Sequence, residues 1–221
     1  MSPIFKKGSR KKAENYRPVS LTSVPWKILE SLIKDNILCY LEEHDLLSSR
    51  QHGFMKGRSC LTNLLTSLET ITTALDEGSG IDVIYLDYAK AFDTVPHRRL
   101  MTKLHAYGIG WSLLLWIEEF LTNRRQKVSV RGTDSEAECI TGVPQGFVLG
   151  PLLFVLFIND LPNHINSDIS MFADDTQVHR RINDDTDKLQ LKDDLDRLHN
   201  WSDKWLLRFN AKKCKKNAPG T

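Results

Sequence analysis

Apolar residues recur at helical spacing in six parts of the chain. The first is residues 28–41, where the apolar positions share one face of a helix that starts after Pro25. The same spacing predicts five more helices, over residues 62–75, 98–106, 111–121, 152–161 and 184–205. The breaker Glu77-Gly78-Ser79-Gly80 closes the second of the six. These six ranges cover more than a third of the chain.

Strand patterns are shorter and lie between these helices. Residues 82–87 are β-branched and apolar, which predicts a strand buried on both faces. Residues 126–130 alternate polar and apolar side chains, which predicts a hairpin strand with its partner near residues 137–140. Three more short strands are predicted, over residues 169–172, 176–179 and 206–209. The order lacks βαβ alternation and internal repeats, so the predicted class is α+β.

Composition limits the size of the domain and the cellular compartment that we expect for this chain. The chain has 221 residues and is 41% hydrophobic, which suffices for one large domain or two small lobes. Its four cysteines are far apart and form no CxxC pair, so neither a zinc site nor a disulfide framework is indicated, and a reducing compartment is favoured. The longest apolar run, residues 147–158, is too short to span a bilayer, and no signal-peptide pattern is present. We expect an intracellular protein with no membrane partner; nucleus or cytoplasm is not indicated.

Basic residues crowd both ends of the chain, although the net charge is only +2. The clusters are Lys6, Lys7, Arg10, Lys11 and Lys12 at the start, and Lys212, Lys213, Lys215 and Lys216 at the end. Charge alone leaves two readings open. The clusters face a phosphate backbone, or they are simply solvated ends of the chain.

Three carboxylates stand where predicted strands end. Asp87 closes the strand 82–87, and Asp174-Asp175 fall in the tight turn between two later strands. Carboxylates delivered in this way are able to hold two divalent cations about 3.5–4 Å apart, the equipment for joining a nucleotide to a 3′-hydroxyl. By itself, however, the Asp174-Asp175 pair is equally well explained as a solvated turn. Two other acidic pairs are predicted to be structural: Asp184-Asp185 as a helix cap and Asp193-Asp194 on a polar helix face.

Longer motifs carry a family resemblance. Residues 85–96 read YLDYAKAFDTVP, residues 141–146 and 148–154 read TGVPQG and VLGPLLF, and residues 172–175 read FADD. In this order they resemble the reverse-transcriptase domain of non-LTR (LINE-type) retrotransposons of the chicken-repeat and jockey kind. Shorter matching blocks lie at residues 15–23, 51–54, 57–59, 209–210 and 213–214. The resemblance covers nearly the whole chain.

The resemblance implies an architecture. It is a right-hand polymerase in which fingers take up about residues 1–80 and the palm about residues 81–215, with a helical insertion at about 97–125. The palm is expected to be an antiparallel sheet backed by helices. Residues 216–221 do not match, and neither a thumb nor an endonuclease domain is expected, so the resemblance implies a truncated copy of such an element.

The resemblance also implies an activity, RNA-directed DNA polymerisation. The chain would add dNTPs to the 3′-hydroxyl of a DNA primer on an RNA template. Asp87 and Asp174 would hold two Mg²⁺ ions, with Asp175 beside them and Mn²⁺ as a possible substitute. Lys213 would protonate the leaving pyrophosphate.

Five further residues are implied to contact the nucleotide. Phe92 falls at the bulky gate that clashes with a ribose 2′-hydroxyl. Gln145 and Gly146 belong to the block that shapes the nucleotide pocket. Arg17 and Lys7 match fingertip positions that grip the triphosphate.

Two positions depart from the family pattern. Phe147 stands where close relatives have Ser, next to the template base, and Phe172 replaces the tyrosine of the wider pattern. Two alternatives remain alongside the polymerase. One is a catalytically inactive remnant or nucleic-acid-binding relic. The other is a telomerase or group II intron enzyme of the same fold, which these motifs fit less well.

Overall fold

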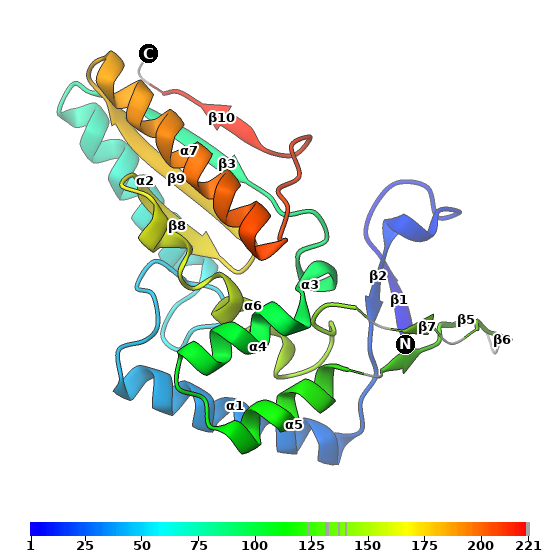
Figure 1. The fold of residues 1–221 in the computed structure, drawn as a ribbon. Coiled ribbons are helices and arrows are strands. Elements are labelled where there is room, and N and C mark those ends of the chain that lie inside the picture. Colours follow the sequence, from blue (N-terminus) through cyan, green and yellow to red (C-terminus); the bar gives the residue numbers. More distant parts are fainter. Residues whose placement is uncertain (123, 131–132, 137, 140, 220–221) are drawn as a thin grey trace. The chain divides into compact units, whose positions relative to one another are not determined.

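The computed structural model describes residues 1–122, 124–130, 133–136, 138–139 and 141–219 (Figure 1). The chain divides into two compact units, each built from two separate stretches. Unit 1 comprises Met1–Leu46 and Phe92–Phe154, and unit 2 comprises Leu47–Ala91 and Val155–Thr221. The helix α6 (Gly150–Ile158) contributes residues to both. Within the described ranges, no helix has both the length and the apolar character that crossing a membrane requires.

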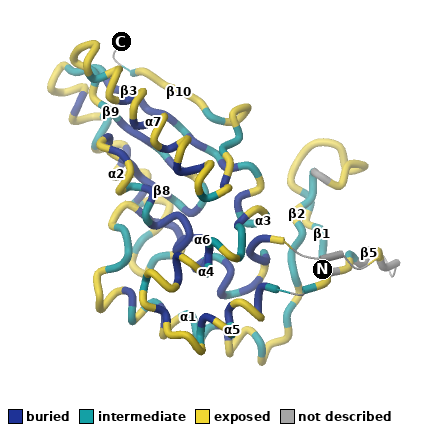
Figure 2. The backbone as a smooth tube through the Cα atoms, viewed as in Figure 1, coloured by how far each residue is buried: buried dark blue, intermediate teal, exposed yellow. Residues whose placement is uncertain are grey.

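Unit 2 is organised by a four-stranded antiparallel sheet in the order β10-β3-β9-β8. Its strands are β3 (Gly80–Leu86), β8 (Asp168–Phe172), β9 (Asp175–Ile182) and β10 (Lys215–Asn217). β3 is paired on both sides, and its residues Ile81, Val83 and Leu86 are buried, as the apolar run predicts. In Figure 2 β3 is largely buried and β9 mixes buried with more exposed positions, whereas the edge strand β10 is exposed.

Two helices cover opposite faces of this sheet. On one face, Ala74 of α2 (Cys60–Asp76) packs against Val83. On the other, Arg180, the register partner of Asp82, forms an ion pair with Asp187 of α7 (Asp185–Trp205) at 3.1 Å. Since neighbouring strand positions point to opposite faces, α2 and α7 lie on opposite sides (Figure 1). A short 3₁₀ turn, η2 (Leu161–His164), leads into β8.

The ends of α7 follow from local chemistry. Asp184 Oδ1 accepts a hydrogen bond from the Asp187 amide at 3.0 Å, which confirms the predicted cap. At the other end Leu206 takes a left-handed conformation with φ 58°, which stops the helix and redirects the chain. The strand predicted over residues 206–209 is therefore wrong: within that stretch only Phe209 makes a single bridge, to Tyr88.

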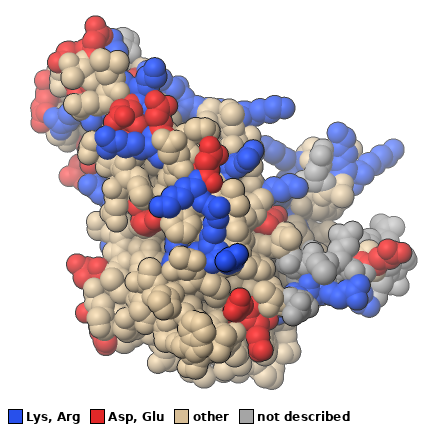
Figure 3. Space-filling model, in the orientation of Figure 1, with Lys and Arg blue, Asp and Glu red and all other residues tan. Residues whose placement is uncertain are grey.

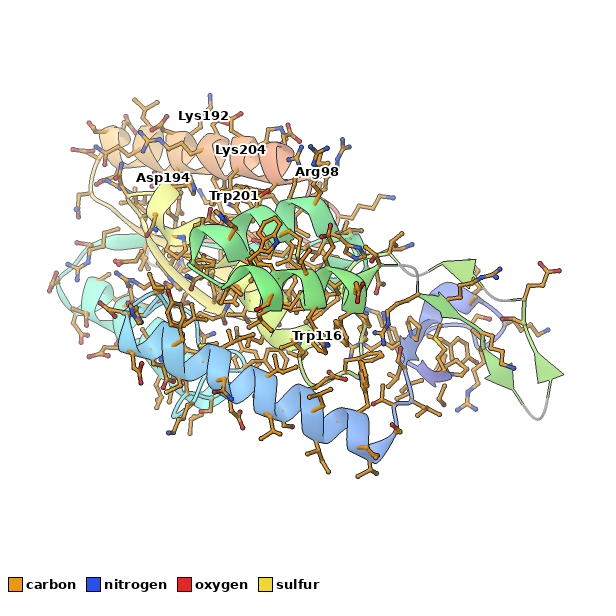
Figure 4. All side chains as sticks on the ribbon, turned by 60° about the horizontal axis from the view of Figure 1, so that its bottom comes forward. Arg98, Trp116, Lys192, Asp194, Trp201 and Lys204 are labelled. Atoms are coloured by element: carbon orange, nitrogen blue, oxygen red, sulfur yellow. The ribbon has the colours of Figure 1, made fainter. Side chains whose placement is uncertain are left out.

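Asp194 on α7 corrects another expectation. It does not lie on the polar face of the helix, because only 1% of it is exposed. Its Oδ2 accepts hydrogen bonds from the amide and hydroxyl of Ser167 at 2.8 and 2.6 Å, which fastens the loop before β8. Figure 4 shows Asp194 and Trp201 turned toward the interior and Lys192 turned away from it. Helical spacing alone did not distinguish this carboxylate from its exposed neighbours.

Unit 1 combines helices with short strands. The helices are α1 (Val24–Glu43), α3 (Ala91–Thr94), α4 (His97–Ala106) and α5 (Trp111–Leu121), with the 3₁₀ turn η1 (Ala13–Asn15). The strands are β1 (Ser2–Phe5), β2 (Tyr16–Val19), β4 (Arg125–Gln126), β5 (Ser129–Val130), β6 (Thr133–Asp134) and β7 (Glu138–Cys139). α1 and α5 meet through stacked rings of Trp26, Trp116 and Phe120.

The predicted α+β class is confirmed, and the six predicted helices are all present. Gln126 pairs with Glu138, as the predicted hairpin requires, but Ser129 and Val130 of the predicted strand pair instead with β6. Residues 137 and 140 of the expected partner lie outside the described residues. Two features were missed. The β1–β2 hairpin lies in a stretch without periodicity, and β10 is a lysine-rich segment that resembles a solvated tail.

Candidate active site

The ends of β3 and β9 place two carboxylates opposite each other. Leu86 pairs with Thr176, so one further step in this antiparallel register sets Asp87 opposite Asp175. Directly opposed residues point to the same face of a sheet and have Cβ atoms about 4.5–5.5 Å apart. Asp87 and Asp175 are therefore delivered together, on the face that α2 covers.

Asp174 lies in the turn that joins β8 to β9. Phe172 pairs with Asp175, which leaves Ala173 and Asp174 as a two-residue hairpin loop. Ala173 has φ 54° and Asp174 does not have a positive φ, the pattern of a type II′ turn whose first position normally holds glycine. An alanine in this region costs roughly 1–2 kcal/mol. The carboxylate pair is thus mounted on a strained turn.

The segment after α7 brings Lys213 to the same place. The Asn210 amide donates to the Asp87 carbonyl at 2.7 Å, and the Lys213 amide donates to the Asn210 carbonyl at 2.9 Å. The Phe209 ring stacks on the Tyr88 ring with centroids 4.8 Å apart. As a result Lys213 Nζ lies 2.7 Å from Asp87 Oδ2 in an ion pair. The segment that contains the matching residues 209–210 and 213–214 is therefore attached to the end of β3.

These groups open onto a cleft of about 400 Å³ within unit 2. Asp87, Asp175 and Lys213 line it, together with Asn63 from α2 and Gln177 from β9. The pKa of Asp175 is raised above its ordinary value, first by partial burial and then by the negative charge of Asp87, while Lys213 acts to lower it. The charges of Asp87 and Asp175 therefore repel each other, and the positive charge of Lys213 partly offsets this repulsion.

The carboxylates of Asp87 and Asp175 are donors that suit a divalent ion, and Asp174 does not line the same cleft. Carboxylate oxygens are the ligands that Mg²⁺ prefers, and the Lys213 ammonium already holds a positive charge at Asp87. Across the part of the chain that the structure describes, no group of three or more His, Cys, Asp or Glu side chains is gathered closely enough to hold a metal. Asp87 and Asp175 are brought together in the cleft; Asp174 stands beside them in the turn and does not line it.

In unit 1 the predicted nucleotide-pocket residues form a second loop that hydrogen bonds hold closely. The Val143 amide donates to the Phe92 carbonyl at 2.7 Å, and Gln145 Nε2 donates to Asp93 Oδ1 at 3.0 Å. The Phe92 ring stacks on Phe154 with centroids 4.5 Å apart. The structure thus brings Phe92 and Gln145 together through Asp93.

Gly146 in this loop has φ 92°, a region that favours glycine. A Cβ at this position would lie 2.6 Å from the Ser20 carbonyl oxygen, and the Ser20 amide donates to the Gln145 carbonyl at 2.9 Å. Glycine here admits the protein's own backbone just after β2. Its role toward a nucleotide stays a prediction.

A buried carboxylate that the sequence did not single out holds the end of this loop. Glu30 of α1 is fully buried, and its Oε2 accepts a hydrogen bond from the Leu149 amide at 2.9 Å. Burial raises the pKa of Glu30, while hydrogen bonds from the backbone of Leu149 and Val148 and the charge of Arg124 act to lower it. The Arg124 guanidinium lies 4.2 Å from the centroid of the Phe147 ring. Phe147, the residue that departs from the family pattern, is itself buried.

The two predicted triphosphate contacts are exposed on the β1–β2 hairpin of unit 1. Arg17 lies on β2 opposite Ile4, and Lys7 lies in the loop between the strands. In unit 2, Figure 3 shows Lys and Arg side chains gathered along the edge that β10 and the preceding loop form. Lys212, Lys213, Lys215 and Lys216 belong to this stretch and are exposed.

Residues 5–218 match the family model described as reverse transcriptase (RNA-dependent DNA polymerase). The chain belongs to this family. Among its relatives is the RNA-directed DNA polymerase from mobile element jockey of Drosophila melanogaster, 32% identical over 213 residues. That alignment covers 91% of this chain and 23% of the relative. The probable RNA-directed DNA polymerase from transposon BS of the same species is 31% identical over 216 residues, covering 90% of this chain and 23% of that relative.

The chain thus spans about a quarter of the length of the relatives that it matches. Solved structures support the fold independently. Apo telomerase from Candida tropicalis has a TM-score of 0.64 at 13% identity, covering 87% of this chain and 37% of that one. A form of it truncated from the C-terminal domain has a TM-score of 0.61, covering 89% of this chain and 41% of that one. The fingers-and-palm class of fold that the sequence predicted is confirmed.

Proposed function

We propose that this chain carries the polymerase centre of a LINE-type retroelement enzyme, which adds dNTPs to a DNA primer on an RNA template. Family membership supports the reaction class. The observation that carries the proposal is the placement of Asp87 and Asp175 at opposed positions of β3 and β9, on one cleft with Lys213. Opposed carboxylates at a rigid strand end suit a reaction in which charge must be neutralised at phosphorus.

In this proposal Asp87, Asp174 and Asp175 hold two Mg²⁺ ions, or Mn²⁺ in their place. When bound, such ions lower the pKa of the primer 3′-hydroxyl and neutralise charge on the triphosphate. Lys213, whose Nζ lies 2.7 Å from Asp87 Oδ2, would pass a proton to the leaving pyrophosphate. The exposed lysines around it would contact the phosphate backbone of the nucleic acid.

The residues of unit 1 would supply contacts to the nucleotide. Arg17, together with Lys7, would bind the triphosphate, a task for which the forked guanidinium is suited. Phe92 would exclude a ribose 2′-hydroxyl, and Gln145 with Gly146 would shape the pocket. The hydrogen bond from Gln145 to Asp93 supports this role, because it holds the amide in one orientation.

Primer extension on poly(rA)/oligo(dT) with Mg²⁺ tests the proposal. We expect the 221-residue chain to incorporate dTTP, and Asp174→Asn to abolish incorporation because it removes a metal-binding charge. Asp193→Asn is the matched control, since it removes an exposed carboxylate of α7 that forms an ion pair with Arg197 at 2.7 Å. Absence of incorporation at every protein concentration would contradict the proposal and favour an inactive remnant that binds nucleic acid.

A further inference from the structure

The block Gln51-His52-Gly53-Phe54 matches the family but has no part in the proposed chemistry. In the structure it lies directly behind the Asp174-Asp175 turn. The His52 amide donates to the Met171 carbonyl at 2.8 Å, and Gln51 pairs with Met171 in an isolated parallel bridge. The block therefore lies alongside the end of β8, the strand that leads into the turn.

Gln51 makes the decisive contact. Its side chain is buried, with 1% exposed, and its Oε1 accepts two hydrogen bonds from backbone amides. One donor is the Ala173 amide at 2.9 Å, and the other is the Gly53 amide at 2.7 Å. Nε2 of Gln51 makes no hydrogen bond among the described residues, so the acceptor oxygen is the working end of this side chain. Ala173 is the residue of positive φ that starts the carboxylate turn.

Steric fit fixes the same turn from a second direction. A Cβ on Gly53 would lie 2.3 Å from the Ala173 amide nitrogen and 3.0 Å from the Ala173 Cα. No side chain fits here without moving the turn. Gly53 therefore sets how closely the two segments approach, while Gln51 sets the direction of the Ala173 amide.

The neighbouring block Gly57-Arg58-Ser59 keeps Gln51 in place. Arg58 Nη1 donates to the carbonyls of Ser48, Ser49 and Gln51 at 3.1, 2.8 and 2.6 Å. Ser59 begins α2 with a capping box that it forms with Thr62. The support of the turn is thus continuous from α2 through Arg58 to Gln51.

We propose that Gln51 is a positioning residue, which holds the strained Ala173-Asp174 turn so that Asp174 and Asp175 present their carboxylates to divalent cations. This inference rests on the proposed function. In this role Gln51 would act through its hydrogen bond with the Ala173 amide, not through contact with substrate or metal. Outer partners that orient metal ligands typically change metal affinity or activity by about 10–100-fold when they are lost.

The test compares Gln51→Met, which keeps the length of the side chain but removes the acceptor, with Ser67→Ala. Ser67 is the matched control because its buried Oγ bonds Ser170 Oγ at 3.0 Å in the same unit, away from the turn. Three measurements are made on each protein: exchange of the Ala173 amide by NMR, Mn²⁺ affinity by EPR titration, and kcat and KM for dTTP in primer extension. Gln51→Glu, which retains the acceptor, is the rescue variant.

We expect Gln51→Met to release the Ala173 amide to exchange, to weaken Mn²⁺ binding by about 10–100-fold, and to lower kcat more than it changes KM. Gln51→Glu is expected to restore amide protection. Unchanged Mn²⁺ affinity in Gln51→Met, or an equal loss in Ser67→Ala, overturns the inference.

The same measurements separate the two proposals. Wild-type protein that binds Mn²⁺ but incorporates nothing contradicts the proposed function and leaves the positioning role standing, provided that Gln51→Met weakens the binding. Wild-type protein that incorporates dTTP while Gln51→Met behaves like Ser67→Ala contradicts the positioning role alone. Wild-type protein with neither property contradicts both.

Discussion

The carboxylate turn of unit 2 and the loop from Gly142 to Leu149 in unit 1 are each held by a buried polar side chain, called its anchor here, and the two anchors differ in chemistry. Each contains a residue of positive φ, Ala173 at 54° in one and Gly142 at 70° in the other, and only the alanine is strained there. Each is held by one buried side chain that accepts hydrogen bonds from its backbone. The anchor is the neutral amide of Gln51 in unit 2 and the carboxyl group of Glu30 in unit 1.

The difference has a physical consequence. A neutral amide adds no charge to the cleft where Asp87 and Asp175 already concentrate negative charge. A carboxyl group is tolerable in unit 1, where Arg124 acts on Glu30 with a positive charge. The unit 1 loop therefore depends on a group that titrates, whereas the unit 2 turn does not.

The largest expected effect tests how tightly the unit 1 loop is packed. In Gly142→Ala, the new Cβ would lie 2.2 Å from the Phe92 carbonyl oxygen at a φ that disfavours alanine. We expect a loss of about 2–5 kcal/mol in the free energy of unfolding. Urea unfolding, with hydrogen exchange to localise the change to unit 1, measures it.

Gly57→Ala is the control for this prediction. Gly57 has nearly the same φ, 71°, but nothing lies within 4 Å of a Cβ built there. Only the backbone cost of about 1–2 kcal/mol is expected. Equal losses in the two variants would show that the close approach of the unit 1 loop to the Phe92 backbone adds nothing.

A middle-sized effect tests the charge on the unit 1 anchor. Burial raises the pKa of Glu30 in the folded protein, so its contribution to stability is full below the unfolded pKa and is lost as pH rises through the folded pKa. Glu30→Gln does not titrate but keeps an acceptor for the Leu149 amide. We expect the melting temperature of wild type minus that of Glu30→Gln to fall as pH rises from about 4 to 7.

The raised pKa of Asp175 has the same sign but is present in both proteins, so it cancels in this difference. Thermal unfolding followed by circular dichroism at several pH values gives the measurement. A melting-temperature difference that does not change between these pH values would mean that the unit 1 loop does not depend on a titrating anchor.

The smallest effect tests the strain in the unit 2 turn. Glycine adopts the φ of Ala173 without steric cost, so Ala173→Gly is expected to gain about 0.5–1 kcal/mol after the entropy of glycine is counted. Ala74→Gly, at a buried position in the last turn of α2, is the control and is expected to lose about 1 kcal/mol or more. A loss of the same size in both, measured by urea unfolding, would remove strain from the description of the turn.

Local patterns predicted much of this molecule. Periodicity placed all six long helices, and the strand-end position of Asp87 and the turn at Asp174 were read directly from apolar runs. Both anchors were missed. Gln51 and Glu30 lie 122 and 119 residues from the amides that they bind, and no local pattern marks a polar side chain that is buried by so distant a partner.

The same limit explains the remaining differences. Asp194 repeats the helical spacing of exposed neighbours, yet a loop near Ser167 buries it. β10 is polar and exposed, so its pairing with β3 depends on backbone bonds that composition does not reveal. The motif at residues 51–54 was recognised as a match, but its place behind the turn required three dimensions.

The pairing of β3 with β9 also constrains how the chain is made. Leu86 cannot pair with Thr176 until about 90 further residues have been synthesised. At about 5–20 residues per second, translation leaves β3 without its partner for on the order of ten seconds. During that time Ile81, Val83, Ile84 and Leu86 form an unpaired apolar strand, the kind of segment that chaperones cover and that aggregates when they do not. The apolar side chains that make β3 a rigid, buried platform in the folded protein therefore make it prone to aggregation during synthesis.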